Sequence, residues 1–223
     1  MNYEARYDEI LTRIEKVRVK VNQHQIVKIV AASKSADNAM IEAMYNIGQR
    51  SFGENKIQDM SEKVHALNHL PLEWHFIGRL QTNKINQLLE LDPFLMHSLS
   101  SLELAHEIDK RLHVKGKTLS VLLQINSAYE EQKAGVLPEE ALDIYDEITS
   151  TCKNLKLKGI MSIGAHSEDS AIIQKSFETS YKIFEALSSK GAKYCSMGMS
   201  NDFELAVECG SNMLRLGSIL FKE

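Results

Sequence analysis

The chain has 223 residues, of which 43% are hydrophobic and 25% are charged, as in an ordinary soluble globular protein. Its net charge of −4 argues against a nucleic-acid or anionic-membrane partner, and no run approaches the roughly 20 apolar residues of a membrane span. Three cysteines without C-x-x-C spacing argue against a disulfide framework and a structural zinc site, so no metal is predicted.

The chain is expected to open with an amphipathic helix over residues 1–24, packed on the rest of the molecule. Apolar side chains recur there at spacings of three and four, on one helical face: Tyr7, Ile10, Ile14, Val17 and Val21. Short apolar runs then predict strands near residues 27–33, 50–52, 74–77, 94–97, 119–125, 157–163, 194–197 and 213–216. Helical patterns predict helices over 37–47, 83–91, 101–112, from Pro138 onward, over 173–187 and over 201–209. In the last of these, Asn201 and Glu204 have capping-box spacing.

This alternation of strands and helices predicts an α/β fold with a parallel sheet, because strands joined by helices pair through right-handed crossovers. Eight such units predict a closed (β/α)8 TIM barrel with an extra N-terminal helix. Only three prolines occur and no linker is visible, so residues 1–223 are expected to form a single domain. The alternative is an open doubly wound sheet, against which no G-x-G-x-x-G follows the first strand.

Lys34 stands at the end of the first predicted strand, in the run I-V-K-I-V-A-A-S-K-S. Strand side chains alternate, so Lys28, Val30, Ala32 and Lys34 should share one face. Desolvation can lower the pKa of a lysine by several units and turn its amine into a nucleophile toward aldehydes. The commoner role is a lysine that caps a strand and reaches solvent.

Two loops near the end of the chain predict an anion site. In a barrel, strand carboxyl ends face the active site, and phosphates commonly bind after strands seven and eight. These loops read C-S-M-G-M-S-N-D from 195 and M-L-R-L-G-S from 213, which offers the hydroxyls of Ser200 and Ser218. The backbone N–H groups of Gly217 and Ser218 would open a last short helix. Glycine and serine in loops without any ligand are the alternative.

Arg215 lies on the same predicted strand face as Met213. If that face is inward, the guanidinium lies in the mouth of the barrel, where a buried arginine needs a partner. The partner is either a nearby carboxylate or an acceptor atom of a ligand.

Two further segments, F-G-E-N and H-F-I-G-R-L-Q-T-N-K, point to the same mouth. Asn55 would hydrogen-bond a ligand oxygen or, as asparagine more often does, cap a helix. His75 is interpreted as a core histidine. Arg79 and Lys84 are interpreted as a solvated helix start.

Taken together, these segments resemble the YggS/PROSC family of pyridoxal 5′-phosphate (PLP) homeostasis proteins. The five blocks are the strand-end lysine, F-G-E-N, H-F-I-G-R-L-Q-x-N-K, S-M-G-M-S-x-D and R-x-G, in this order over about residues 26–221. The resemblance implies a fold-type III PLP-binding barrel, similar to the N-terminal domain of alanine racemase. It also implies a protein that binds PLP and takes part in intracellular PLP homeostasis, without established turnover of amino acids.

The resemblance also implies a cofactor site made of Lys34, Asn55, Ser200, Arg215, Gly217 and Ser218. In it, Lys34 forms the Schiff base with the PLP aldehyde, Arg215 faces the pyridine nitrogen and Asn55 lies near the ring. Ser200 is on the phosphate side, with Gly217 and Ser218 as the phosphate cradle. No catalytic residue is assigned.

The chain departs from the family pattern at three places. The loop after the sixth predicted strand, S-I-G-A-H-S-E-D at 162–169, is more polar than usual. The chain finishes with I-L-F-K-E where the family more often has F-G, and Ser218 stands where threonine is common. The first two differences concern the outer wall of the predicted mouth rather than Lys34.

Three functions of different classes remain open: a PLP carrier or buffer, a low-activity PLP-dependent racemase, and a cofactor-free aldolase in which Lys34 attacks the substrate. Arginine beside the ring nitrogen opposes its protonation and weakens the electron sink, which favours the carrier. No residues remain for the second domain that supplies an acid/base group in the racemases. The implied partners are PLP and PLP-dependent apoenzymes. We expect a monomer and, because no signal peptide is visible and the thiols should be reduced, a cytoplasmic location.

Overall fold

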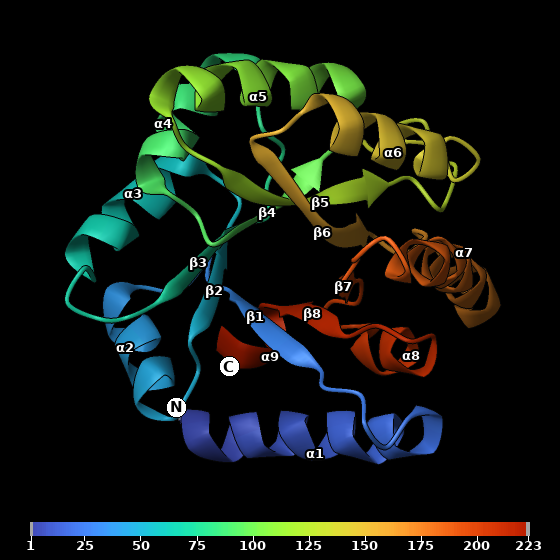
Figure 1. The fold of residues 1–223 in the computed structure, drawn as a ribbon. Helices are drawn as coiled ribbons and strands as arrows, with labels where there is room; N and C mark the ends of the chain where they lie inside the picture. The colour runs from blue at the N-terminus through green and yellow to red at the C-terminus, as the bar shows by residue number, and fades with distance from the viewer. Residues whose placement is uncertain (1, 222–223) are drawn as a thin grey trace.

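Eight parallel strands form a closed barrel in the order β1-β2-β3-β4-β5-β6-β7-β8, with helices around the outside (Figure 1). The structure is a computed structural model that describes residues 2–221; Lys222 and Glu223 of the unusual C-terminal sequence lie outside the described residues. The strands are β1 (Lys28–Ala32), β2 (Ser51–Glu54), β3 (Glu73–Phe76), β4 (Leu95–Leu99), β5 (Leu119–Ile125), β6 (Leu155–Ser162), β7 (Tyr194–Ser196) and β8 (Met213–Leu216). The helices are α1 (Tyr3–Val21), α2 (Asn38–Asn46), α3 (Ile57–Ala66), the 3-10 helix η1 (Thr82–Lys84), α4 (Ile85–Leu91), α5 (Leu102–Lys115), α6 (Ala141–Thr151), α7 (Ser170–Ser188), α8 (Phe203–Glu208) and α9 (Ser218–Phe221).

The predicted (β/α)8 barrel is confirmed. The alternative of an open sheet is wrong, because β8 pairs with β1 and closes the ring. Side-chain caps fix several helix starts: Asp37 accepts from the Met40 N–H at α2, and Ser101 accepts from the Leu104 N–H at α5. Both helices begin within one residue of their predicted starts at 37 and 101.

One helix was missed, and two predictions about helices are wrong. Helix α3 was not predicted; it has no side-chain cap and buries only Met60 fully, so its sequence signal is weak. Pro138 does not begin a helix, since residues 138–140 form a turn and α6 begins at Ala141. Asn201 and Glu204 do not form a capping box, because Asp202 is the cap residue of α8 and the carboxylate of Glu204 binds elsewhere.

The N-terminal helix α1 runs along the outside of the barrel and packs against α8 (Figure 1). Its buried face contains Ile10, Ile14 and Val17. Arg13 of α1 reaches the Glu204 carboxylate at 2.7 Å, which uses the side chain that the sequence had suggested as a cap. No helix within residues 2–221 is long and apolar enough to cross a membrane.

The barrel interior has an apolar middle and polar ends. A small cluster of buried side chains fills the middle: Val30, Leu95, Leu122, Met161 and Met213. At the amino end, the Lys28 amine lies 2.5 Å from the Glu73 carboxylate and 4.8 Å from the centre of the Phe94 ring. The Ser51 hydroxyl donates to the same carboxylate at 2.6 Å. The barrel is therefore plugged at this end, and any ligand must enter at the other.

Candidate functional site

A cavity of about 790 Å³ opens at the carboxyl end of the barrel, beside the loops that follow β1, β6, β7 and β8. Five of the six predicted site residues line it: Lys34, Ser200, Arg215, Gly217 and Ser218. Its volume lies within the range of roughly 300–1,000 Å³ typical of small-molecule sites. The topology explains the convergence, because β8 and β1 are neighbours although they lie at opposite ends of the sequence.

Lys34 stands two residues beyond β1, and its side chain is exposed on the cavity. Within residues 2–221 its amine has no ion-pair partner. The backbone before it is fixed, since the buried Ser33 donates its N–H to the Gly53 carbonyl at 3.0 Å. The Lys63 amine donates to the Ser33 carbonyl at 2.7 Å. Lys34 therefore presents an exposed amine, unpaired within the described residues, from a backbone that hydrogen bonds hold in place.

Glu54 helps to fix the backbone that precedes Lys34. Its fully buried carboxylate accepts from the Ser33 hydroxyl at 2.6 Å and from the Lys63 amine at 2.7 Å, both at Oε1. Its Oε2 atom is buried and has no partner among the described residues. A buried carboxylate is unfavourable unless paired, and here the pairing with Lys63 satisfies one oxygen and leaves the desolvation of Oε2 without compensation from the described residues. Sequence reasoning missed this role, although an acid in an otherwise buried strand was the available signal.

Arg215 points into the barrel, on the face predicted from alternation. The guanidinium donates from Nη1 to the carbonyl oxygen and hydroxyl of Ser196 at 2.9 and 2.8 Å. It donates from Nη2 to the Ser162 carbonyl at 2.9 Å. Burial lowers the pKa of Arg215 to about 10, while the Asp202 carboxylate acts in the opposite direction. Arg215 thus stays charged at neutral pH, and within the described residues it is held by neutral acceptors rather than by an ion pair.

A chain of polar groups continues from Arg215 into the barrel. The Ser196 hydroxyl lies 3.3 Å from His97 Nδ1, and His97 Nε2 lies 2.9 Å from His75 Nδ1. His75 Nε2 is buried without a partner in the described part of the chain. Burial lowers the pKa of His75 to about 3 and holds the pKa of His97 well below its usual value. Both rings are neutral at pH 7, so His75 is a core histidine, as interpreted from the sequence.

The loops after β7 and β8 meet around the Ser200 hydroxyl. Its oxygen accepts from the backbone N–H groups of Gly217 and Ile219 at 3.2 and 3.3 Å. Its hydrogen remains free to donate into the cavity. Gly198 makes this turn possible, because φ is +96° and a Cβ there would lie 2.6 Å from the Ala206 Cβ.

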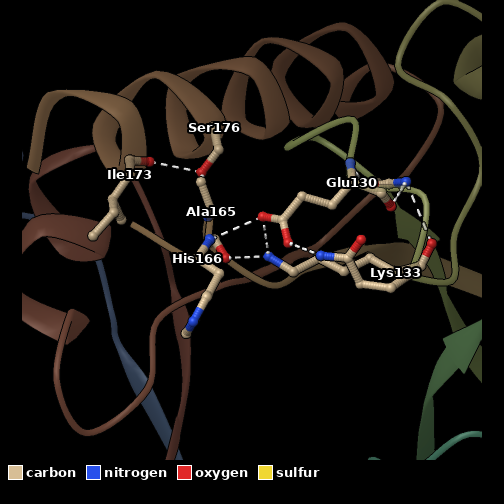
Figure 2. Close-up of polar contacts among 9 residues, drawn as sticks. Glu130, Lys133, Ala165, His166, Ile173 and Ser176 are labelled. Atoms are coloured by element: carbon tan, nitrogen blue, oxygen red, sulfur yellow. Dashed lines mark hydrogen bonds and ion pairs between the residues drawn. The ribbon is translucent and has the colours of Figure 1, made fainter. Parts of the chain in front are cut away.

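The polar loop after β6 forms the opposite wall, with residues 163–167 on the cavity. Figure 2 shows how Glu130 and Lys133, from the loop after β5, hold it in place. The Lys133 amine donates to the Gly164 carbonyl at 2.7 Å, and Glu130 accepts from the His166 N–H at 2.9 Å. The Lys133 amine and the Glu130 carboxylate also pair with each other at 2.8 Å. The sequence departure at this loop is therefore part of the wall of the site.

The other side of this wall is fixed by α7. The Ala165 N–H donates to the Ser176 hydroxyl at 3.1 Å, and that hydroxyl donates to the Ile173 carbonyl at 2.7 Å (Figure 2). Four residues that the sequence analysis did not name as site residues also line the cavity: Lys133, His166, Met199 and Asp202. The last three belong to loops that the sequence placed at the mouth, whereas Lys133 comes from a loop that it did not consider. All four follow the carboxyl end of a strand, which is the signal that would have found them.

Asn55 does not join the other five predicted residues. It lines a separate cavity of about 690 Å³ beside α3 and η1, together with Arg79 and Lys84. It also does not cap α3, whose cap residue is Lys56 without a side-chain hydrogen bond.

Comparison with known proteins places the chain among proteins with this barrel. The family model described as alanine racemase, N-terminal domain, matches residues 6–223. A pyridoxal phosphate homeostasis protein of Helicobacter pylori strain J99 is 57% identical over 223 residues, covering 100% of both chains. The human pyridoxal phosphate homeostasis protein is 36% identical over 209 residues, which is 88% of this chain and 76% of that protein.

Among solved structures, PipY of Synechococcus elongatus with PLP bound superposes with a TM-score of 0.79 at 29% sequence identity. The match covers 94% of this chain and 98% of PipY. A protein from Bifidobacterium adolescentis described as unknown superposes with a TM-score of 0.91 at 31% identity, covering 98% of this chain and 94% of that one.

Proposed function

Because the chain belongs to the family of pyridoxal phosphate homeostasis proteins, we propose that it binds PLP as a Schiff base at Lys34 and takes part in PLP homeostasis as a carrier. The observation that carries this proposal is the convergence of Lys34, Arg215 and Ser200 on one cavity. The names of the relatives support a homeostatic role for this chain, and the PLP-bound PipY structure supports the choice of cofactor.

The residues around the cavity fit the chemical groups of PLP. The Lys34 amine matches the aldehyde, and the Arg215 guanidinium offers a donor to the ring nitrogen. The Ser200 hydroxyl and the backbone N–H group of Ser218 offer donors to the phosphate, while the Gly217 N–H donates to the Ser200 oxygen and so fixes the hydroxyl in place. A volume of about 790 Å³ leaves room for a ligand of this size. In this assignment Asn55 lies outside the cavity, and its predicted role at the ring has no support from its position.

Two of these side chains determine what a bound cofactor can do. Bound PLP supplies an electron sink for amino-acid chemistry, and the sink is strong only when its ring nitrogen is protonated. Lys34 would hold the cofactor by its aldehyde, since a lysine amine condenses with an aldehyde and releases water. Arg215, charged at neutral pH with a pKa of about 10, opposes protonation of a nitrogen beside it. This favours storage over turnover and supports a protein that holds PLP without converting amino acids.

The proposed carrier role also implies which partners the protein has. A carrier must release its cargo, so PLP-dependent apoenzymes are the proposed recipients, and we propose that the protein acts as a monomer in the cytoplasm. Because β1 and β8 together form the site, residues 1–223 are proposed to act as a single domain.

The deciding experiment is the intact mass of the protein after incubation with PLP and borohydride reduction. One PLP per chain is expected, with peptide mapping to Lys34. A protein that gains no mass contradicts the proposal and leaves the cofactor-free aldolase alternative. Rapid exchange of the α-hydrogen of added alanine would instead favour the racemase alternative.

A further inference from the structure

Two of the motif blocks that identify the family contribute their polar side chains to a cavity other than the proposed PLP cavity. The end of F-G-E-N supplies Asn55 and the next residue, Lys56; H-F-I-G-R-L-Q-T-N-K supplies Arg79, Gln81 and Lys84. The cavity has a volume of about 690 Å³ and lies between α3 and the η1–α4 segment. None of these five side chains lines the cavity that holds Lys34.

This second cavity carries excess positive charge. Lys56, Arg79 and Lys84 line it, and none of them has an ion pair within residues 2–221. Glu90 is the one carboxylate among the lining residues that the structure describes, and it lies 3.7 Å from the Lys115 amine. Three uncompensated cations around one hollow, on a chain of net charge −4, form a local attraction for an anion.

Two further features of the cavity, its backbone N–H groups and its apolar side chains, also indicate what kind of ligand it suits. Helix α3 begins at Ile57 without a side-chain cap, so first-turn N–H groups are left without a side-chain acceptor beside the cavity. Ile57 and Leu91, both partly exposed, give the cavity an apolar surface above the buried Phe76. A ligand that satisfies both features has an anionic end and an apolar body.

The cationic rim is also held rigidly. A Cβ at Gly78 would lie 1.9 Å from the Asn55 carbonyl oxygen, so only glycine allows the two motif blocks to touch at this point. The Ser98 hydroxyl donates to the Gly78 carbonyl at 2.5 Å and fixes the same peptide from the neighbouring strand. Arg79 follows directly, so its backbone is set by these contacts. Pre-organisation of this kind lowers the entropic penalty of binding.

We propose that this cavity is a second binding site, for a phosphate monoester with an apolar group. A phosphate monoester carries about −1.5 to −2 charges and three acceptor oxygens, which suits Lys56, Arg79 and Lys84 together better than a single carboxylate does. The phosphate contacts the cations and the apolar group lies against Ile57 and Leu91. The site does not require the Lys34 amine and explains residues that the proposed function leaves unused.

The test measures binding of inorganic phosphate and of phenyl phosphate by calorimetry, with the PLP cavity filled by borohydride-reduced PLP. Fluorescence of Trp74, the single tryptophan, provides a second readout because Trp74 lies two residues before Phe76 on β3. The parent is expected to bind phenyl phosphate saturably and several-fold more tightly than inorganic phosphate. Equal affinities for the two probes overturn the monoester assignment.

The variants Arg79→Gln and Lys84→Gln locate the site. Both side chains reach the surface, so the variants are expected to fold, which urea unfolding checks. Each is expected to weaken phenyl phosphate binding by roughly tenfold or more, the effect of losing one charged hydrogen bond. Lys175→Gln, an exposed lysine on α7 away from both cavities, is the matched control and should bind like the parent.

The result that overturns the proposal is a parent protein that shows no saturable binding, or cation variants that bind as tightly as the parent. If PLP fails to attach at all, the calorimetry is repeated on unmodified protein. There, loss of binding in Arg79→Gln but not in Ser200→Ala still supports the second site, and the reverse pattern rejects it. Failure of the proposed function and failure of this inference therefore give different results.

Discussion

Lys28 begins β1 and Lys34 stands two residues beyond its end, and the two amines meet opposite surroundings. The Lys28 amine lies 2.5 Å from the Glu73 carboxylate and above the Phe94 ring, at the plugged amino end of the barrel. Lys34 lies beyond the carboxyl end of β1, exposed on a cavity of about 790 Å³. Alternation along a strand sets which way a side chain points. Position along the barrel axis decides whether its charge is neutralised by the fold or remains available to a ligand.

The largest expected effect separates these two lysines. Lys34→Ala should abolish the reducible PLP adduct and leave the stability nearly unchanged, because the side chain is exposed and unpaired within the described residues. Lys28→Ala should retain the adduct but destabilise the fold by roughly 1–3 kcal/mol, since Glu73 loses a partner. Intact mass after borohydride and urea unfolding measure the two effects. An adduct of equal yield in Lys34→Ala would assign the chemistry to another lysine.

Lys63 is a third lysine for this comparison, because its amine holds in place the backbone that precedes Lys34. Glu54→Ala leaves the Lys63 amine without its buried partner and should lower the unfolding free energy by about 3–5 kcal/mol. Glu54→Gln keeps an acceptor for Ser33 and should lose less stability. If Glu54 positions Lys34, folded Glu54→Gln should also form the PLP adduct more slowly than the parent. Unchanged kinetics in stopped-flow absorbance would limit Glu54 to a purely structural role.

Arg215 tests the other side of the proposed site. Glutamate at this position would set a carboxylate against the Ser196 and Ser162 carbonyl oxygens, so Arg215→Gln is the more informative variant. Loss of a charged hydrogen bond of about 1.5–3 kcal/mol should weaken PLP retention roughly 10–100-fold. It should also raise any slow deuterium exchange into alanine, since the ring nitrogen is no longer beside a cation. A parent that already exchanges at about 1 s⁻¹ or faster contradicts the carrier.

Sequence patterns predicted the barrel well because its signals are local. The bounds of β5 (Leu119–Ile125) and β8 (Met213–Leu216) match the prediction, since each strand is a mostly apolar and almost fully buried run. Helix α3 was missed because it lacks a cap and fully buries only Met60. Glu204 was wrongly predicted to take part in a helix cap. Its spacing suits a capping box, but its carboxylate forms a tertiary ion pair with Arg13. Local rules fail where a distant residue supplies the better partner.

The candidate site shows the same limit. Lys34 and Arg215 were assigned to one mouth because closure of a barrel brings its first and last strands together. Asn55 was placed with them by resemblance, but in the structure it lines another cavity beside α3, the helix that was not predicted. The contacts of Lys133 with the loop after β6 join residues about thirty positions apart through two irregular loops. No periodicity encodes such a contact.

Lowering the pH should reduce the free energy of unfolding mainly through the two buried histidines of the barrel interior. His75 has a pKa of about 3 because of burial and the nearby Lys28 charge, and His97 is held neutral by burial. Unfolded histidine binds a proton near pH 6.5, so the unfolded state gains protons first as the pH falls. Between pH 6.5 and 4.5 the unfolding free energy should fall, approaching about 1.4 kcal/mol per pH unit for each histidine. His75→Gln should flatten this slope, whereas exposed His113→Gln should not; equal slopes would contradict the burial argument.

The smallest effect is expected at Ser200. This residue lies at the proposed phosphate end of the cavity, where PLP binding does not depend on covalent attachment. Ser200→Ala removes a hydroxyl donor but frees the Gly217 and Ile219 N–H groups, which in the parent donate to the Ser200 oxygen. Because these backbone donors replace much of what is lost, PLP affinity should fall only about threefold to tenfold, or roughly 0.5–1.5 kcal/mol. Ser218→Ala, whose hydroxyl has no hydrogen bond within residues 2–221, should lose no more. Equilibrium dialysis in the Lys34→Ala background isolates this non-covalent contribution, and identical affinities with and without Ser200 would remove the phosphate from this end of the cavity.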